Sequence, residues 1–244
     1  MTDPFAPLRR LTAARVALGR VGASLPTAEV LRFSLAHARA RDAVHAPLAA
    51  EALAGALSDL GLESVILASA APDRATYLRR PDLGRRLAAG EAARLPTGAD
   101  VALVIADGLS STAVEAQAAA FLSALLPGLR AAGLSTGSAV IVRQGRVAVG
   151  DEIGAAMGAR LTLLLIGERP GLSAADSLGL YLTWGPRPGR SDAERNCISN
   201  IRAGGLPTAA AAETALWLIR ESLRRGLSGV ALKEGEVALP APDR

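Results

Sequence analysis

The amino-acid sequence predicts an α/β protein, in which an N-terminal helical region precedes an open, mostly parallel, Rossmann-like sheet with flanking helices. Three observations lead to this prediction. Helical spacing of apolar residues dominates up to residue 60, short apolar runs with the length of buried strands follow, and helical stretches alternate with those runs. We therefore expect a helical region at 1–61 and an α/β domain at 62–244.

The helical region is predicted to contain two helices. Apolar side chains such as Val30 and Leu35 recur at helical spacing within 25–48. Pro26 suits the first turn of this helix, and Pro47 marks its end. A second helix is expected at 47–60, where the next residue is a glycine.

Four apolar runs, three of them rich in β-branched residues, predict buried strands. The runs are 64–68, 101–106, 139–143 and 161–166, and the helices expected between and after them are 111–132, 151–157 and 208–225. We expect 81–96 to link the two parts and the proline-bearing tail, 234–244, to fray. Open α/β sheets bind ligands beyond the carboxyl ends of their strands, so functional residues are sought there.

Composition narrows the class of protein. A single cysteine excludes an intrachain disulfide framework and indicates a reducing compartment. The apolar runs are far shorter than the ~20 residues of a membrane span, and the start lacks a secretory pattern. The net charge is +4, and almost all of the positive charge is arginine, which could bind nucleic acid. Only 3% of residues, however, are aromatic. With few stacking platforms, nucleic-acid binding is disfavoured.

Polar turns follow two of the predicted strands. After 101–106, Asp107 and Gly108 lead to Ser110, Ser111 and Thr112, any of which can cap the next helix. Free amides there could meet a phosphate or a polar ligand, although an ordinary strand-to-helix turn is the simpler interpretation. After 161–166, Glu168 could accept hydrogen bonds from amide or hydroxyl donors, and Arg169 could form a bidentate contact with a phosphate or carboxylate. Ordinary ion pairing of both is an equal alternative.

The single cysteine, Cys197, lies in a polar segment at 192–202. Both histidines, His37 and His45, fall in the helical region, so a histidine-activated thiol nucleophile is disfavoured. A ligand contact or a packed thiol is the better interpretation. Phosphate-binding loops, zinc motifs, the dinucleotide fingerprint and the D-x-H-x-x-G corrinoid motif are absent from the sequence. The residues alone therefore predict an α/β ligand-binding protein without catalytic or metal-ligating residues.

Six segments, in order along the chain, resemble the small (light) subunit family of ethanolamine ammonia-lyase. They are ARVALGRVGASLPTAEVLRFSLAHARARDAV (14–44), YLRRPDLGRRL (77–87), VIADGLSSTAV (104–114), VRQGRVAVGDEIGAAMGAR (142–160), LIGERPGLSAADSLGLYLTW (165–184) and ERNCISNIRAGG (194–205). The resemblance implies a radical enzyme that uses adenosylcobalamin to convert ethanolamine to acetaldehyde and ammonia. It also implies a large TIM-barrel subunit that holds the substrate, so that this chain is inactive alone, in a hexamer of heterodimers.

Within this resemblance, 62–244 becomes a cobalamin-binding domain. The family's cofactor contacts fall on Val147, Glu168 and Cys197, with Asp107, Gly108 and Ser110 as the next candidates. No metal ligand is expected on this chain, because the family binds cobalamin with its own benzimidazole on cobalt. The competing interpretation from another class is a non-catalytic α/β module that binds a nucleotide or another phosphate, using the turns at Asp107 and Glu168.

The resemblance also bears on location. Some members carry a longer N-terminal extension that is linked to packaging in a bacterial microcompartment, whereas this chain begins shortly before the shared core. We expect a free cytoplasmic enzyme, with the microcompartment as the alternative.

Overall fold

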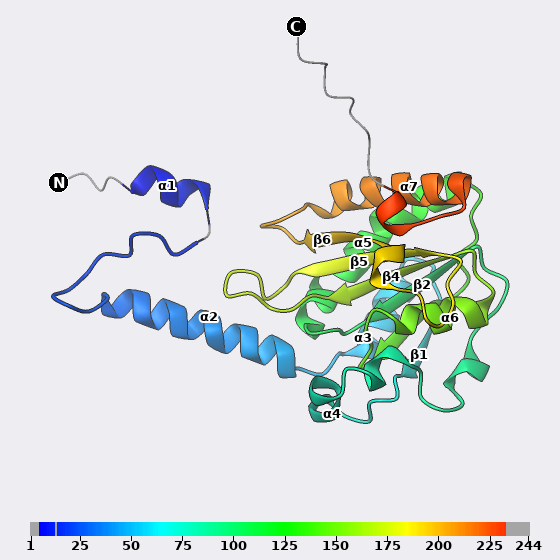
Figure 1. Cartoon of the computed structure of the whole chain (residues 1–244), viewed down its shortest axis with the longest axis horizontal. Helices are drawn as coiled ribbons and strands as arrows, with labels where there is room; N and C mark the ends of the chain where they lie inside the picture. The colour runs from blue at the N-terminus through cyan, green and yellow to red at the C-terminus, as the bar shows by residue number, and fades with distance from the viewer. Residues whose placement is uncertain (1–4, 13, 233–244) are drawn as a thin grey trace, which may run out of the picture.

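One mixed sheet organises the described part of the chain, which is residues 5–12 and 14–232 of this computed structural model (Figure 1). Its strands lie in the order β1-β3-β2-β4-β5-β6. The strands are β1 (Ser64–Ala68), β2 (Val101–Ala106), β3 (Ala139–Arg143), β4 (Leu161–Gly167), β5 (Leu178–Trp184) and β6 (Arg195–Ile201). Pairing is parallel from β1 to β4, whereas β5 runs antiparallel to β4 and β6 antiparallel to β5. The predicted α/β, mostly parallel fold is confirmed.

The four predicted strands are present, and only β4 is longer than expected, by Gly167. The last two strands were not predicted. In β6 the buried residues Arg195, Ile198 and Ile201 are each separated by two partly or fully exposed residues, so the sequence resembles a polar loop and not a buried strand. The sequence therefore indicated the parallel part of the sheet but not its antiparallel edge.

Seven α-helices lie within the described residues. They are α1 (Ala6–Leu11), α2 (Thr27–His45), α3 (Ala50–Ser58), α4 (Arg74–Arg79), α5 (Ser111–Ala131), α6 (Val149–Met157) and α7 (Thr208–Arg225). All five predicted helices form, and α1 and α4 were missed. The prediction that 81–96 is a linker is corrected by the structure. This segment contains two 3-10 turns, η1 (Leu83–Arg85) and η2 (Glu91–Arg94), and it buries Leu87 and Leu95 in the core. The tail at 234–244 lies outside the described residues.

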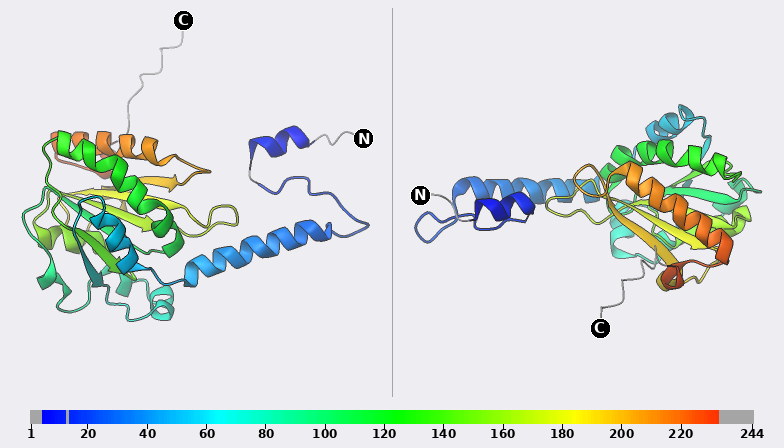
Figure 2. Two further views of the ribbon diagram at one scale, coloured as in Figure 1. Left: turned by 180° about the vertical axis from the view of Figure 1, so that it is seen from behind. Right: turned by 90° about the horizontal axis from the view of Figure 1, so that it is seen from above.

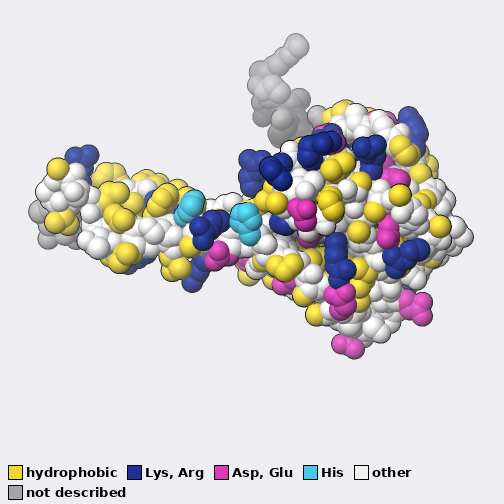
Figure 3. Space-filling view, turned by 90° about the horizontal axis from the view of Figure 1, so that it is seen from below, with side chains coloured by type: hydrophobic (Ala, Val, Ile, Leu, Met, Phe, Trp, Pro, Cys, Tyr) yellow, Lys and Arg dark blue, Asp and Glu magenta, His cyan; other side chains and the backbone are white. Residues whose placement is uncertain are grey.

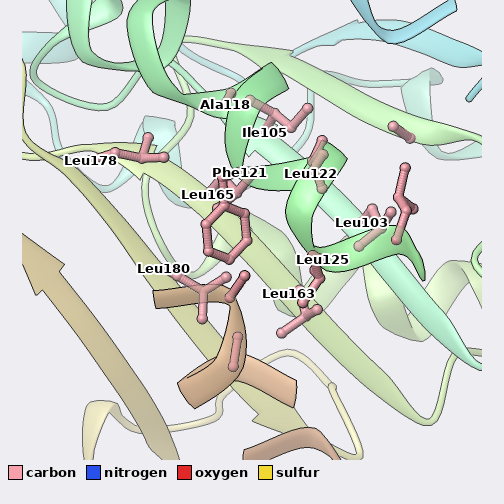
Figure 4. Close-up of a cluster of buried hydrophobic side chains, with 14 of the residues drawn as sticks. Leu103, Ile105, Ala118, Phe121, Leu122, Leu125, Leu163, Leu165, Leu178 and Leu180 are labelled. Atoms are coloured by element: carbon pink, nitrogen blue, oxygen red, sulfur yellow. The ribbon is translucent and has the colours of Figure 1, made fainter. Parts of the chain in front are cut away.

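The larger core lies between the sheet and three helices, α3, α5 and α7. Period-two alternation in β2 sends Val101, Leu103 and Ile105 to this face and the residues between them to the other. The fully buried ring of Phe121, from α5, lies among leucines of β4 and β5 (Figure 4). Within the described residues α5 is the one helix long and apolar enough to cross a bilayer, but nine of its residues are buried here, so packing accounts for its composition.

The opposite face is covered by α6, which packs against β2 and β4. A buried ion pair joins α6 to the edge strand β6. The Asp151 carboxylate accepts from both terminal nitrogens of Arg195, and Arg195 also donates to Thr183 Oγ1 at 3.2 Å. Losing one partner of such a pair leaves an uncompensated buried charge. This pair therefore fixes the antiparallel edge relative to α6.

The N-terminal arm, by which we mean the described residues from 5 to 45, projects from the sheet (Figures 1 and 2). Its long helix α2 buries only Ala43. The arm is attached at its end, where Arg74 Nε donates to Val44 O at 2.6 Å. The division at residue 61 stays a prediction, and α3, on the N-terminal side of it, buries Leu53 and Leu57 in the larger core.

Candidate functional site

The turns that follow β2 and β4 interlock at the carboxyl edge of the sheet. Leu109 N donates to Gly167 O at 2.9 Å, and Gly108 adopts a φ of +57°. A Cβ on Gly108 would lie 2.3 Å from Gly167 O, and a Cβ on Gly167 would lie 1.9 Å from Ser110 O. Both glycines are therefore required for the two turns to approach each other.

Asp107 connects this pair of turns to the loop after β3. Its buried carboxylate accepts from Gln144 N and from Gly145 N, each at 3.0 Å, and Arg74 Nη1 lies 3.5 Å away. Burial raises the pKa of the Asp107 carboxyl, against the opposing effect of these donors. Its oxygens are used inside the protein, so Asp107 shapes the site from within.

Ser110 is likewise used internally. It is the N-cap of α5, where its hydroxyl accepts from Ala113 N at 3.1 Å and donates to Ala175 O at 2.7 Å. Of the three residues predicted in this turn, the buried side chains of Asp107 and Ser110 hold the turn in shape, whereas Gly108 lines an adjacent cavity.

Glu168 is held by hydrogen bonds across the antiparallel edge. Its carboxylate accepts from the hydroxyl of Ser177 at 2.5 Å, from the hydroxyl of Ser199, and from Asn200 N at 3.1 Å. Gly179 leaves room for it, since a Cβ there would lie 3.1 Å from Glu168 Cγ. The carboxylate is thus oriented in advance as a hydrogen-bond acceptor.

Strained backbone supports both carboxylates. Among the described residues of the α/β domain, Gln144 and Asn200 are the non-glycine residues with positive φ, at 58° and 61°. The backbone N–H of Gln144 donates a hydrogen bond to Asp107, and the backbone N–H of Asn200 donates one to Glu168. Such strain persists where surrounding structure enforces it, and it concentrates at functional sites.

A cavity of about 240 Å³ opens between these turns. Its lining includes Val147, Glu168, Arg169, Tyr77 and Tyr181. It therefore combines an apolar wall, a carboxylate acceptor and guanidinium donors. Arg169 makes no hydrogen bond or ion pair through its side chain to any described residue, so the predicted alternative of ordinary ion pairing is not what the structure has here.

Tyr181 connects this cavity to Cys197. The sheet register places Leu164, Tyr181 and Cys197 in one row across β4, β5 and β6. Burial, followed by the neighbouring thiol, raises the pKa of Tyr181 to about 12. Desolvation by surrounding atoms also raises the pKa of the Cys197 thiol, although part of this residue is exposed. At neutral pH the thiol is protonated and is a poor nucleophile.

A second hollow, of about 470 Å³, adjoins the cavity and shares Arg146, Val147 and Tyr181 with it. The Arg146 guanidinium lies 4.3 Å from the centroid of the Tyr77 ring, and its Nη2 donates to Tyr77 O at 3.2 Å. Its buried Nε has no hydrogen-bond partner among the described residues. The two hollows form one groove along the edge of the sheet, which we call the rim groove.

The structure thus brings the three main predicted residues together: Val147 and Glu168 line the cavity, and Cys197 pairs across strands with Tyr181. Sequence reasoning missed Tyr77, Arg146 and Tyr181. Arg146 directly precedes Val147 in the GRV segment, which was a usable signal. Tyr181 needed β5 to be recognised, since only strand register places it beside Cys197. Among residues 5–12 and 14–232, no group of three or more His, Cys, Asp or Glu side chains is arranged to hold a metal ion.

Comparisons with known proteins agree over nearly the whole chain. The family model described as ethanolamine ammonia-lyase light chain (EutC) matches residues 2–233. The chain is 57% identical to an ethanolamine ammonia-lyase small subunit of Azotobacter vinelandii, over 97% of this chain and 90% of the relative. It is 54% identical to that of Ralstonia nicotianae and 53% to that of Pseudomonas putida strain GB-1, each over 95% of this chain and 88% of the relative.

Proposed function

Because the chain belongs to the ethanolamine ammonia-lyase light chain family, and is thus the small subunit of a lyase in ethanolamine catabolism, we propose that its rim groove holds one edge of adenosylcobalamin against a large catalytic subunit. The observation that carries this proposal is the convergence of Val147, Glu168 and Tyr181 on one cavity. Sequence reasoning selected two of these residues before the fold placed them side by side.

The residues of the groove fit a corrin edge chemically. A corrin ring carries amide side chains, and the preorganised Glu168 carboxylate would accept from an amide N–H, while Val147 and Tyr181 offer apolar surface. The buried Nε of Arg146 has no partner among the described residues and would donate to a ligand oxygen. Cys197, with a protonated thiol, would contact the ligand rather than attack it.

The size of the groove supports a shared site. The two hollows of the rim groove measure about 240 and 470 Å³, which together fall within the ~300–1,000 Å³ of pockets that enclose drug-sized ligands. Adenosylcobalamin, which is larger than such ligands, can therefore place only part of its surface here. We propose that the large subunit covers the remainder and binds ethanolamine. When bound, the cofactor supplies the radical chemistry of the reaction, and this chain binds, orients and shields it.

The arm is the element that we propose to dock on the large subunit. Its exposed apolar residues include Leu11, Val21, Val30, Leu31 and Leu35. Apolar side chains cover much of the arm on the face seen in Figure 3. Contiguous exposed apolar surface of this kind marks protein–protein contacts. The hexamer of heterodimers, and a cytoplasmic or microcompartment location, are further parts of this proposal, which native mass spectrometry and cell fractionation would test.

The central experiment is reconstitution. Co-expression with the large subunit is expected to give a complex that co-purifies and forms acetaldehyde from ethanolamine only with adenosylcobalamin, whereas this chain alone forms none. Failure of the two chains to associate, or product formation without the cofactor, would contradict the proposal.

Glu168→Ala is expected to weaken adenosylcobalamin binding to the reconstituted complex. Loss of one hydrogen bond to a charged group corresponds to a roughly ten- to hundredfold rise in Kd. Equilibrium binding followed by absorbance measures it. Glu213→Ala, which removes an exposed glutamate from α7, is the matched control and should leave the Kd unchanged. An unchanged Kd in the Glu168 variant would remove this residue from the site.

A further inference from the structure

The larger hollow of the rim groove is lined by four arginines, Arg85, Arg146, Arg190 and Arg195, and by one acidic residue, Asp192. Two of these arginines are neutralised within the protein. Arg190 pairs with Glu194, and Arg195 pairs with Asp151 and with Asp192. Their guanidinium groups also donate to backbone carbonyls of Gly185 and Arg190, so they form a structured wall.

The other two arginines carry the unpaired positive charge. Arg85 is exposed at the end of η1, and its side chain makes no hydrogen bond or ion pair to any described residue. Arg146 has no acidic partner among the described residues, and both its Nε and its Nη1 lack hydrogen-bond acceptors there. An arginine pair with free donors matches the oxygens of a phosphate group.

The position of Arg146 is built rather than incidental. A Cβ on Gly84 would lie 2.7 Å from Arg146 Cγ, so only a glycine lets η1 cross the aliphatic stem of this arginine. Arg146 N also donates to Gly84 O at 2.7 Å, and the guanidinium rests on the Tyr77 ring. These contacts hold the side chain in place, and its Nη2 donates to Tyr77 O, but its Nε and Nη1 have no acceptor among the described residues. The fold therefore pre-orders Arg146 without satisfying it.

From these observations we propose that Arg85 and Arg146 bind the phosphodiester of the nucleotide loop of the cofactor. The inference rests on the proposed cofactor site and divides the rim groove into two parts. The cavity at Glu168 receives amide donors of the corrin edge, and the arginine-lined hollow receives the phosphate. Val147 and Tyr181 line both parts, which places the two subsites next to each other.

The test compares two ligands on the reconstituted complex of both subunits. Adenosylcobalamin carries the phosphodiester, whereas adenosylcobinamide has the corrin and its amides but lacks the phosphate. Arg146→Met and Arg85→Met are each expected to raise the Kd of adenosylcobalamin, by roughly ten- to hundredfold for Arg146, in line with the loss of a charged hydrogen bond. The Kd of adenosylcobinamide should change by less than about twofold, because the lost bond has no partner in that ligand.

Two controls sharpen the comparison. Arg130→Met removes an exposed guanidinium at the far end of α5 and should affect neither ligand. Retained adenosylcobinamide binding shows that each variant is folded, and Arg85→Met, at an exposed position, tests the inference if Arg146→Met disturbs the packing on Tyr77. Equal losses for both ligands, or no loss for adenosylcobalamin, would overturn the assignment. Selective loss in Arg169→Met instead would move the phosphate to the smaller cavity and also overturn it. Binding of neither ligand to the unmodified complex would overturn the cofactor site itself.

Discussion

The N-terminal arm and the α/β domain use apolar residues in opposite ways. The 21-residue helix α5 buries nine residues against the sheet and α7, whereas the 19-residue helix α2 buries one. Phe121 of α5 is 0% exposed and Phe33 of α2 is 47% exposed. The α/β domain thus derives its stability from its own core, while the arm carries apolar surface that no described residue covers.

The same residue types are buried in one region and exposed in the other, and this exposure is the basis for proposing the arm as a docking element. Helices are stabilised in proteins mainly by packing of an apolar face, and α2 buries only Ala43 against the described part of the chain. The arm is attached to the rim of the groove, since Arg74 bonds to Val44 O and to Gly108 O. The proposed docking element and the proposed cofactor site are therefore neighbours in the structure.

The largest expected contrast comes from the two phenylalanines. Phe121→Ala should lower the free energy of unfolding by about 3–5 kcal/mol, because it leaves a cavity in the core. Phe33→Ala, on the arm, should change it by no more than about 0.5 kcal/mol in the isolated chain. Urea denaturation of the two variants measures both values. Comparable losses would show that the arm is packed as the core is, and would contradict the proposed difference between the two regions.

Charge on the arm should act on assembly instead of stability. The variant Leu31→Asp places a carboxylate on the arm at a position where the native side chain is 64% exposed. The melting temperature of the isolated chain is expected to stay the same, whereas affinity for the large subunit should fall by about 2 kcal/mol, as for an interface anchor. Pull-down and calorimetry test this. Val230→Asp alters an exposed apolar residue outside the arm and is the control. Equal effects of the two variants would argue against the arm as the docking element.

The smallest effect concerns thiol reactivity at the rim. The pKa of Cys197 is raised, so its thiolate fraction at pH 8 is below that of an ordinary thiol, and alkylation by iodoacetamide should be several-fold slower than for free cysteine. As pH rises through the elevated pKa, the rate should increase. A cysteine on the arm, made by Leu31→Cys in a Cys197→Ser background, should react at the ordinary rate. Identical pH profiles would show that the rim does not desolvate the thiol.

The Cys197→Ser change should retain much activity in the complex, since we assign this thiol a contact role.

Particular elements show why prediction succeeded in some places and failed in others. Strands β1 to β4 are continuous apolar runs because both faces of a parallel sheet are covered, and such runs are visible locally. In β6, Cys197 and Ser199 point to an open face and interrupt the pattern. The 81–96 segment looked like a linker, because Leu87 and Leu95 are isolated in sequence and join the core only through tertiary contacts.

By itself the sequence determined the α/β class, the four parallel strands, the arm helix and the family of the chain, and it selected Val147, Glu168 and Cys197. The tertiary structure alone decided that these residues meet around Tyr181, that Asp107 and Ser110 are used internally, and that Arg146 is ordered yet unsatisfied. The physical reason is the range of the interactions. Composition and periodicity act over a few neighbouring residues, whereas strand register, burial and unpaired donors depend on residues that only the folded chain brings into contact.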